Sequence, residues 1–258
     1  MLIPLLFVEI NFIRLIMTEF KWQIDTIRTV LFSNEKFKFK KKEWSKIVTG
    51  LDISNEMTQE ENGITTQYVE ITNLDHNRQF NLVHIKEQNV IDLQLVFERD
   101  EKYYSYAEIA KEVESFFSQN EALFNLFDEN IIRIGNVVEL SIPIENEKIG
   151  CSLLKHNVSY FNNIDDDLDE ISFRSNKSYI YNNIKINQVI QYANGQKMSL
   201  VIDPQMGIPK ANIQKNILMN IDVNTDAGHR SKLDIKDFNS SLKNSVLTLI
   251  KNGGSYVS

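Results

Sequence analysis

Apolar residues recur at every second position over much of this chain, and this period constrains the possible folds more than any other feature of the sequence. The runs that show it most clearly are residues 91–97, 132–142, 184–192, 198–202 and 217–223. Side chains alternate between the two faces of a β-strand, so such a run buries one face and leaves the other more polar. The period therefore predicts mainly antiparallel sheet with one face open or covered only in part.

Two other segments carry the helical period. Ser105 and Glu108 form a capping-box pattern, in which each side chain bonds an amide that the first helical turn leaves free. Apolar residues follow at helical spacing, and we expect an amphipathic helix over residues 105–127. A second amphipathic helix is expected over residues 234–251, because a pair of glycines follows it as a stop.

Strands thus precede a helix twice along the chain, which predicts an α+β fold. The sequence shows no short repeat, so a duplication of the strands-then-helix unit would exist only in the structure. We expect an extension or loosely packed segment over residues 1–16, an N-terminal half over 17–128 and a C-terminal half over 129–258. An irregular polar connection is expected over residues 143–170, and Asn194-Gly195 predicts a hairpin turn between two runs.

Charge and cysteine content narrow the functional classes. The chain has 258 residues, with 28 basic and 35 acidic side chains and a formal net charge of −7. That balance does not suit a protein that coats nucleic acid over its whole surface, although it leaves a local basic patch open. The single cysteine, Cys151, excludes an internal disulfide framework and a cysteine-rich zinc site, which agrees with a reducing cytoplasm.

Residues 1–16 look hydrophobic, but Glu9, Asn11 and Arg14 interrupt them. No stretch approaches the roughly 20 consecutive apolar residues that span a bilayer, and no signal-peptide cleavage pattern is present. We therefore expect a cytoplasmic protein without a membrane segment.

Signatures of common enzymes are missing from the sequence. It contains no glycine-rich phosphate loop, no G-x-S-x-G elbow and no H-E-x-x-H zinc motif, and we expect no cofactor. Cys151 and His156 are close in sequence, but a nucleophilic pair would require the fold to bring their side chains together. Nothing in the sequence does so.

A metal-dependent nuclease would gather carboxylates at the end of a strand, with a lysine nearby. Asp100 and Lys102 follow the strand that contains Asp92, and these three residues are the metal-site candidates. An exposed charged turn is the alternative that we favour. The acidic run at residues 165–170 lacks the spacing of a calcium-binding loop and is interpreted as a solvated loop.

Lysines alternate with aromatic residues between Lys36 and Lys46, and such a run can neutralise phosphates and stack on bases. The candidates for nucleic-acid binding are Lys38, Lys40, Lys41, Lys42 and Trp44. The same alternation suits an edge strand or a solvated face, because lysines discourage pairing between sheet edges. We favour this second interpretation.

The stretch NIDVNTDAGHR gathers polar side chains behind the last alternating run. Asp222 and His229 could form an acid–base pair, and with Arg230 they are the catalytic candidates. In the alternative that we favour, Thr225 and Asp226 bond the turn backbone, and the stretch only joins a strand to the last helix.

Parts of the chain resemble a sporadically distributed family of uncharacterised prokaryotic α+β proteins of about this length. The strand IIRIGNVVELSIP is similar to the family's R-x-G-x-x-x-x-x-x-I-P pattern, and ILMNIDV, before a closing helix, is similar to its L-L-x-I-D-V pattern. The resemblance extends over residues 80–251. It implies that Arg133 and Asp222 are family-typical polar positions, and that the gene belongs to a mobile or host-conflict setting.

We therefore expect a non-enzymatic cytoplasmic protein that acts through protein–protein contacts, as a homodimer or with a protein partner, in a prokaryotic accessory or defence setting. A metal-dependent nuclease or hydrolase that uses carboxylates at a sheet end is the first alternative. A nucleic-acid-binding module that uses the run from Lys36 to Lys46 is the second.

Overall fold

The computed structural model describes residues 21–37, 41–73, 78–97, 102–126, 130–163, 168–202 and 209–254. Its strands are β1 (Gln23–Ser33), β2 (Asn55–Glu61), β3 (Ile64–Asn73), β4 (Arg78–Ile85), β5 (Val90–Phe97), β6 (Ile131–Pro143), β7 (Ser172–Tyr181), β8 (Ile184–Ile202) and β9 (Pro209–Thr225). Its α-helices are α2 (Lys41–Thr49), α3 (Tyr106–Leu123), α4 (Glu147–Asn157) and α5 (Ile235–Lys251), and short 3₁₀ turns cover Phe124–Leu126 and Ser159–Phe161.

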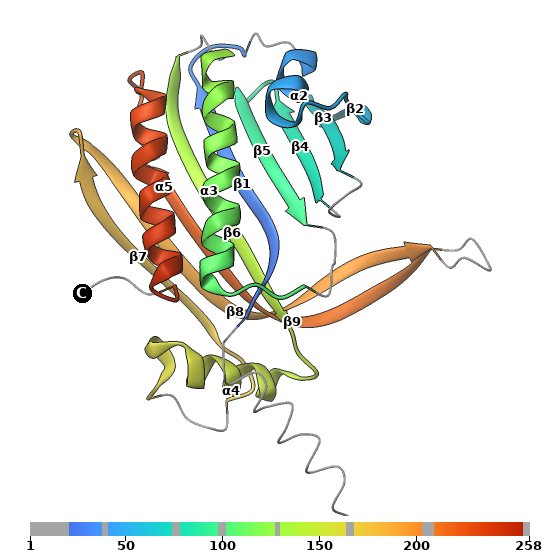
Figure 1. Cartoon of the computed structure of the whole chain (residues 1–258), viewed down its shortest axis with the longest axis vertical. Coiled ribbons are helices and arrows are strands. Elements are labelled where there is room, and N and C mark those ends of the chain that lie inside the picture. Colours follow the sequence, from blue (N-terminus) through green and yellow to red (C-terminus); the bar gives the residue numbers. More distant parts are fainter. Residues whose placement is uncertain are drawn as a thin grey trace, which may run out of the picture.

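The predicted α+β fold is confirmed. In the described residues the strands form a single open sheet of nine antiparallel strands, in the order β2-β3-β4-β5-β1-β6-β9-β8-β7. The two longest helices, α3 and α5, lie side by side across one face of this sheet (Figure 1). The other face carries no helix in Figure 1.

The same order of elements occurs in both halves of the chain. A first strand is followed by a short helix, a meander of strands and a long helix: β1, α2, β2 to β5 and α3, then β6, α4, β7 to β9 and α5. In each half the first strand pairs with the last, β1 with β5 and β6 with β9. Antiparallel pairing of β1 with β6 joins the halves into one sheet. The duplication therefore exists in the topology, although the sequence has no repeat.

The residues that the sequence predicts at the ends of the two long helices are found there. The Ser105 side chain accepts from the Glu108 amide, and the Glu108 carboxylate accepts from the Ser105 amide, so the predicted capping box is present at the start of α3. Asp234 caps α5 by accepting from the Asp237 amide. Gly253 and Gly254 follow α5 with φ of 62° and 73°, a left-handed conformation that glycine adopts without steric cost.

The alternating runs bury one face against α3 and α5. Ile91, Leu93 and Leu95 of β5 are each no more than 3% exposed, while Gln94 between them is half-buried on the open face. Ile217, Met219, Ile221 and Val223 of β9 are all buried in the same core. Removing this much apolar surface from water is the main stabilising contribution to the fold.

Four polar residues lie inside this core, where the two halves meet. Thr29 of β1 donates to Asn136 of β6 (3.0 Å), and Asn136 donates to Asn239 of α5 (3.2 Å). Asn120 of α3 donates to Thr29 at 3.4 Å. All four side chains are at most 1% exposed. This polar network links both central strands to both long helices. One of its atoms, Asn239 Nδ2, is buried without a hydrogen-bond partner.

The predicted hairpin at Asn194-Gly195 is wrong. Both residues lie inside β8, where they pair with Ile217 and Asn216 of β9. A Cβ at residue 195 would come within 2.6 Å of Leu218 Cδ1, so glycine serves close packing here instead of a turn. The turn between β7 and β8 is at Asn182 and Asn183, both with positive φ, as a tight hairpin requires.

The lysine run does not continue as an edge strand, because α2 begins at Lys41. Trp44, Ser45 and Val48 are buried at helical spacing, while Lys42 and Lys46 are exposed. The edge-strand interpretation is therefore wrong for this part of the run, and the solvated face holds for Lys42 and Lys46. Lys38 and Lys40 lie outside the described residues.

The connection over residues 143–170 is not irregular throughout, since it contains α4. Asn146 caps this helix by accepting from the Ile149 amide, and Gly150, Cys151 and Leu154 form its buried face. No helix in the described ranges is both long and apolar enough to cross a membrane. Residues 1–16 and residues 165–167 of the acidic run lie outside those ranges.

Candidate functional site

A two-stranded ribbon projects from the sheet (Figure 1, orange). β8 pairs with β7 only as far as Ala193, and β9 pairs with β6 only as far as Asn216. In the described residues, β8 and β9 pair only with each other from Lys197 opposite Gln214 to Ile202 opposite Pro209. We call residues 197–202 and 209–214 the arm, which spans about 20 Å at 3.3 Å per residue.

Helix α4 braces the base of the arm. The Asn194 side chain of β8 donates to the Glu147 carbonyl (3.1 Å) and to the Cys151 sulfur (3.5 Å). Lys215 of β9 forms an ion pair with the Glu147 carboxylate at 2.9 Å. Contact with Lys215 lowers the pKa of Glu147, so this pair stays charged at neutral pH. These contacts hold the ribbon where it leaves the sheet.

The arm is apolar and basic in sequence. Its two strands read KMSLVI and PKANIQ, with two lysines and no acidic residue. Ile213 is 60% exposed. An isolated two-stranded hairpin is only marginally stable in water. In the described residues, the outer edges of these two strands pair with no third strand.

The edge of the sheet at β2 is acidic, whereas the arm is basic in sequence. β2 pairs only with β3, and its sequence NEMTQEE contains three glutamates and no basic residue. Every residue of β2 is exposed. Three large apolar side chains lie among the glutamates, with Met57 51%, Ile64 37% and Tyr68 36% exposed. We call β2, Ile64 and Tyr68 the acidic edge.

The catalytic candidates do not form an acid–base pair in the structure. Asp222 accepts from Asn224 on the same strand (2.8 Å), and Arg230 donates to the carbonyls of Ala227 and His229. His229 Nε2 is buried without a hydrogen-bond partner. Asp222 and His229 are thus not hydrogen-bonded to each other in the described residues.

The turn behind Asp222 is held by Asp226, whose carboxylate accepts from the Gly228 amide at 3.0 Å. This supports the turn interpretation for Asp226. Thr225 behaves differently, because its hydroxyl accepts from the Ile134 amide of β6 at 3.0 Å instead of bonding the turn. The Asp222 carboxylate instead accepts from Asn224 within its own strand.

We therefore expect Asp222→Ala and His229→Ala to lower the free energy of unfolding by less than about 1 kcal/mol each. Asp226→Ala should cost more than either, about 1 kcal/mol, because it removes a hydrogen bond that holds the turn. Urea unfolding followed by circular dichroism measures all three. A larger loss for Asp222→Ala than for Asp226→Ala would contradict this assignment.

Arg133, the other position that the family resemblance singles out, stacks on Phe32 with its guanidinium carbon 4.3 Å from the ring centre. Its Nε is buried without a partner. Burial, and then the nearby charge of Arg230, lower the pKa of Arg133, while Asp226 and Asp222 oppose this effect. The contact fixes Arg133 across the β1–β6 seam as a packing element.

The three metal candidates are not brought together. Asp92 lies on the open face, where it bonds Arg28 and accepts from Gln94 (2.8 Å), so its oxygens already have partners. Lys102 lies over the Tyr104 ring at 4.6 Å, and Asp100 lies outside the described residues. Within the described part of the chain, no group of three or more His, Cys, Asp or Glu residues is arranged to hold a metal ion.

The nucleic-acid and thiol candidates also have other roles. Trp44 is 2% exposed and so cannot stack on a base, whereas Lys42 is exposed at the start of α2 beside Lys41. Cys151 accepts from Asn194, and burial raises the pKa of its thiol. His156 bonds the Ser152 carbonyl through Nδ1 at 2.7 Å, so it does not serve Cys151.

The arm escaped sequence reasoning because Asn194-Gly195 was interpreted as a turn. The runs 184–192 and 198–202 both place their alternating apolar residues at even-numbered positions, and this shared register is the signal for one longer strand. Comparison of the chain with protein-family models, with curated proteins and with solved structures finds no match.

Proposed function

We propose that this chain is a non-enzymatic interaction protein that associates with a second copy of itself through the arm. The observation that carries the proposal is the ribbon itself, which extends beyond the sheet and pairs with no third strand in the described residues. A ribbon of this length is marginal in isolation, so contact with another protein surface would stabilise it.

The acidic edge of the second copy is the surface that suits the arm. The arm contributes apolar residues and lysines, and the acidic edge contributes apolar side chains and three glutamates. Opposite charges around an apolar contact favour one docking arrangement over others. β2 is also the last strand of the sheet in the described residues, and an edge strand can accept an added strand from a partner.

Each copy has one arm and one acidic edge, so two copies can make both contacts at once. Such reciprocal contacts close a symmetric dimer and leave neither arm free. Stable interfaces bury about 1,200–2,000 Å² in total, and the two contacts would share this area. The family resemblance adds a proposed setting, in which the dimer serves a prokaryotic accessory or defence system through further protein contacts.

Shortening the arm tests this proposal. Replacing residues 197–214 with Asn-Gly joins Gln196 to Lys215 through a two-residue hairpin turn that suits their pairing. We expect the wild-type protein to be a dimer and the shortened protein to be a monomer of unchanged thermal stability at low concentration. Size-exclusion chromatography with light scattering measures both masses.

Two single substitutions provide a matched pair for the same measurement. Ile213→Glu places a carboxylate on the arm, facing the acidic edge in the proposed dimer, and should weaken the dimer at least about tenfold. Ile180→Glu changes a side chain of β7 that is 67% exposed, against 60% for Ile213, and should leave the dimer intact. A wild-type monomer at about 100 µM, a concentration well above a micromolar Kd, would contradict the proposal. A shortened protein that still dimerises would contradict it equally.

A further inference from the structure

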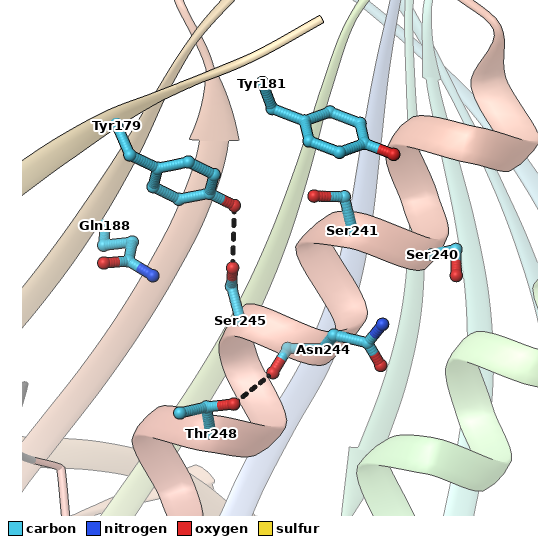
Figure 2. A pocket seen from close by; sticks show the side chains of 8 residues that line it. All are labelled: Tyr179, Tyr181, Gln188, Ser240, Ser241, Asn244, Ser245 and Thr248. Carbon is cyan, nitrogen blue, oxygen red and sulfur yellow. Dashed lines mark hydrogen bonds between the residues drawn. The ribbon is translucent and has the colours of Figure 1, made fainter. Parts of the chain in front are cut away.

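A cavity of ≈410 Å³ lies between the β7–β8 hairpin and α5, on the helix-bearing side of the sheet. This volume is within the usual range of small-molecule sites, about 300–1,000 Å³. Figure 2 shows Tyr179 and Tyr181 reaching from β7 toward the helix, with Gln188 of β8 beside them. On α5, Ser241, Asn244 and Thr248 face the same space.

The two halves of the fold explain why this space exists. In the first half, α2 packs beside the long helix α3, and its Trp44 and Val48 are buried there. By element order, α5 corresponds to α3 and β8 to β4. The corresponding short helix, α4, contacts β8 and β9 at the base of the arm. The position beside α5 is therefore open where the first half has a packed helix.

The lining of the cavity is polar and uncharged. Its described residues are two tyrosines, four residues with aliphatic hydroxyls and two with side-chain amides, and none of them is charged. Hydroxyls and amides together offer both donors and acceptors to a ligand.

Several hydroxyl protons are already used within the protein. Tyr181 donates to the Asp237 carboxylate (2.7 Å), and Thr248 donates to the Asn244 carbonyl (2.8 Å). The bond to Asp237 raises the pKa of Tyr181, so its hydroxyl keeps the proton at neutral pH. These two oxygens can only accept from a ligand. Tyr179 and Ser245 share one hydrogen bond of 2.8 Å across the cavity (Figure 2).

We infer that this cavity is a binding site for a neutral saccharide. Sugar hydroxyls donate to oxygens whose own protons are committed, and they accept from the Asn244 amide. The faces of Tyr179 and Tyr181 provide apolar surface for the C–H side of a sugar ring. An anionic ligand would meet oxygen lone pairs without a cation among the lining residues, so a phosphate or carboxylate on the sugar should weaken binding.

Saturation-transfer NMR on the full chain tests the inference, with glucose, galactose, N-acetylglucosamine and maltose as neutral probes. Glucose 6-phosphate and glucuronic acid are the charged counterparts. We expect at least one neutral probe to bind with a Kd on the order of 1 mM, and its charged counterpart at least about tenfold more weakly. Failure of all four neutral probes, or equal binding of the charged ones, would overturn the inference.

Variants place the binding in this cavity. Tyr179→Ala and Asn244→Ala should each weaken the best probe at least about fivefold, in line with losing one contact of about 1 kcal/mol. Ser178→Ala is the control, because Ser178 neighbours Tyr179 but lies on the opposite face of β7. Circular dichroism checks that each variant is folded. Equal binding by Ser178→Ala and Tyr179→Ala would overturn the inference. Sugar binding can be tested independently of dimerisation, because the protein with the shortened arm keeps all the residues that line the cavity.

Discussion

Replacing Asn136 with alanine is expected to lower the free energy of unfolding by about 3 kcal/mol. Asn136 is fully buried, and it accepts from Thr29 while donating to Asn239. Its removal leaves a buried hydroxyl without its acceptor and a buried amide oxygen without its donor. Each such group costs about 1–3 kcal/mol, and the small cavity left behind adds to the loss. Urea unfolding at constant m-value measures the change.

Asn220→Ala is the matched control for this substitution, because Asn220 is an asparagine on the open face of the neighbouring strand β9. It should change the free energy of unfolding by less than about 1 kcal/mol. The double variant Asn136→Leu/Asn239→Leu should recover part of the loss, because no polar partner is then left unpaired between these positions. Equal losses for Asn136→Ala and Asn220→Ala would show that the polar network does not stabilise the core.

Arg28→Ala is expected to cost about 2 kcal/mol, the second largest effect. Arg28 bonds Asp92 through Nε (3.3 Å) and Nη2, and it lies 3.7 Å from Glu139. The Asp92 side chain is only 10% exposed, so it loses a charged partner in a largely buried place. The Arg28 side chain is 31% exposed, which keeps the cost below that of a fully buried pair.

The comparison for Arg28 is Lys148→Ala, which breaks the ion pair with Asp169. Those side chains are 71% and 77% exposed, and their loss should change stability by less than about 0.5 kcal/mol. The double variant Arg28→Ala/Asp92→Ala should cost less than the sum of its single changes, because the pair is lost only once. Thermal unfolding of the four proteins measures the coupling, and strict additivity would argue against it.

The fold was predictable where a local signal agreed with its tertiary context. Ser105 and Glu108 mark the start of α3 in sequence because a capping box is a local arrangement. The alternation of β5 and β9 predicted their buried faces for the same reason, since each strand has one covered face. In both cases the residues involved are close neighbours along the chain.

Predictions failed where distant contacts decided the structure. Asn194-Gly195 has the sequence of a turn, but Leu218 packs on the glycine and α4 accepts the asparagine amide, so the strand continues. The lysine run alternates like a strand, but the burial of Trp44 and Val48 favours a helix. Leu218 and α4, the partners of Asn194-Gly195, lie at least 20 residues from Gly195 in the sequence, so no local pattern can show them.

The polar network and the arm were invisible to sequence reasoning for a related reason. Thr29, Asn136 and Asn239 lie in three separate elements, and only the sheet order brings them together. The arm exists because β6 and β7 stop pairing before β8 and β9 do. A strand's own sequence does not show where its neighbours end.

A charge exchange between the arm and the acidic edge tests the proposed self-association most directly. One variant carries Lys197→Glu and Lys210→Glu on the arm, and the other carries Glu60→Lys and Glu61→Lys on the edge. In each variant alone, arm and edge then have the same sign of charge, so we expect both to sediment as monomers. In an equal mixture every arm of one variant meets an edge of opposite charge on the other.

Sedimentation velocity of the mixture should therefore show a heterodimer, with a mass and a concentration dependence close to those of the wild-type dimer. Because each variant changes only one of the two surfaces, recovery on mixing requires that they contact each other. Docking of the arm on the acidic edge would be contradicted if the two variants remain dimers when each is measured alone. It would also be contradicted if their mixture remains monomeric while the wild type dimerises.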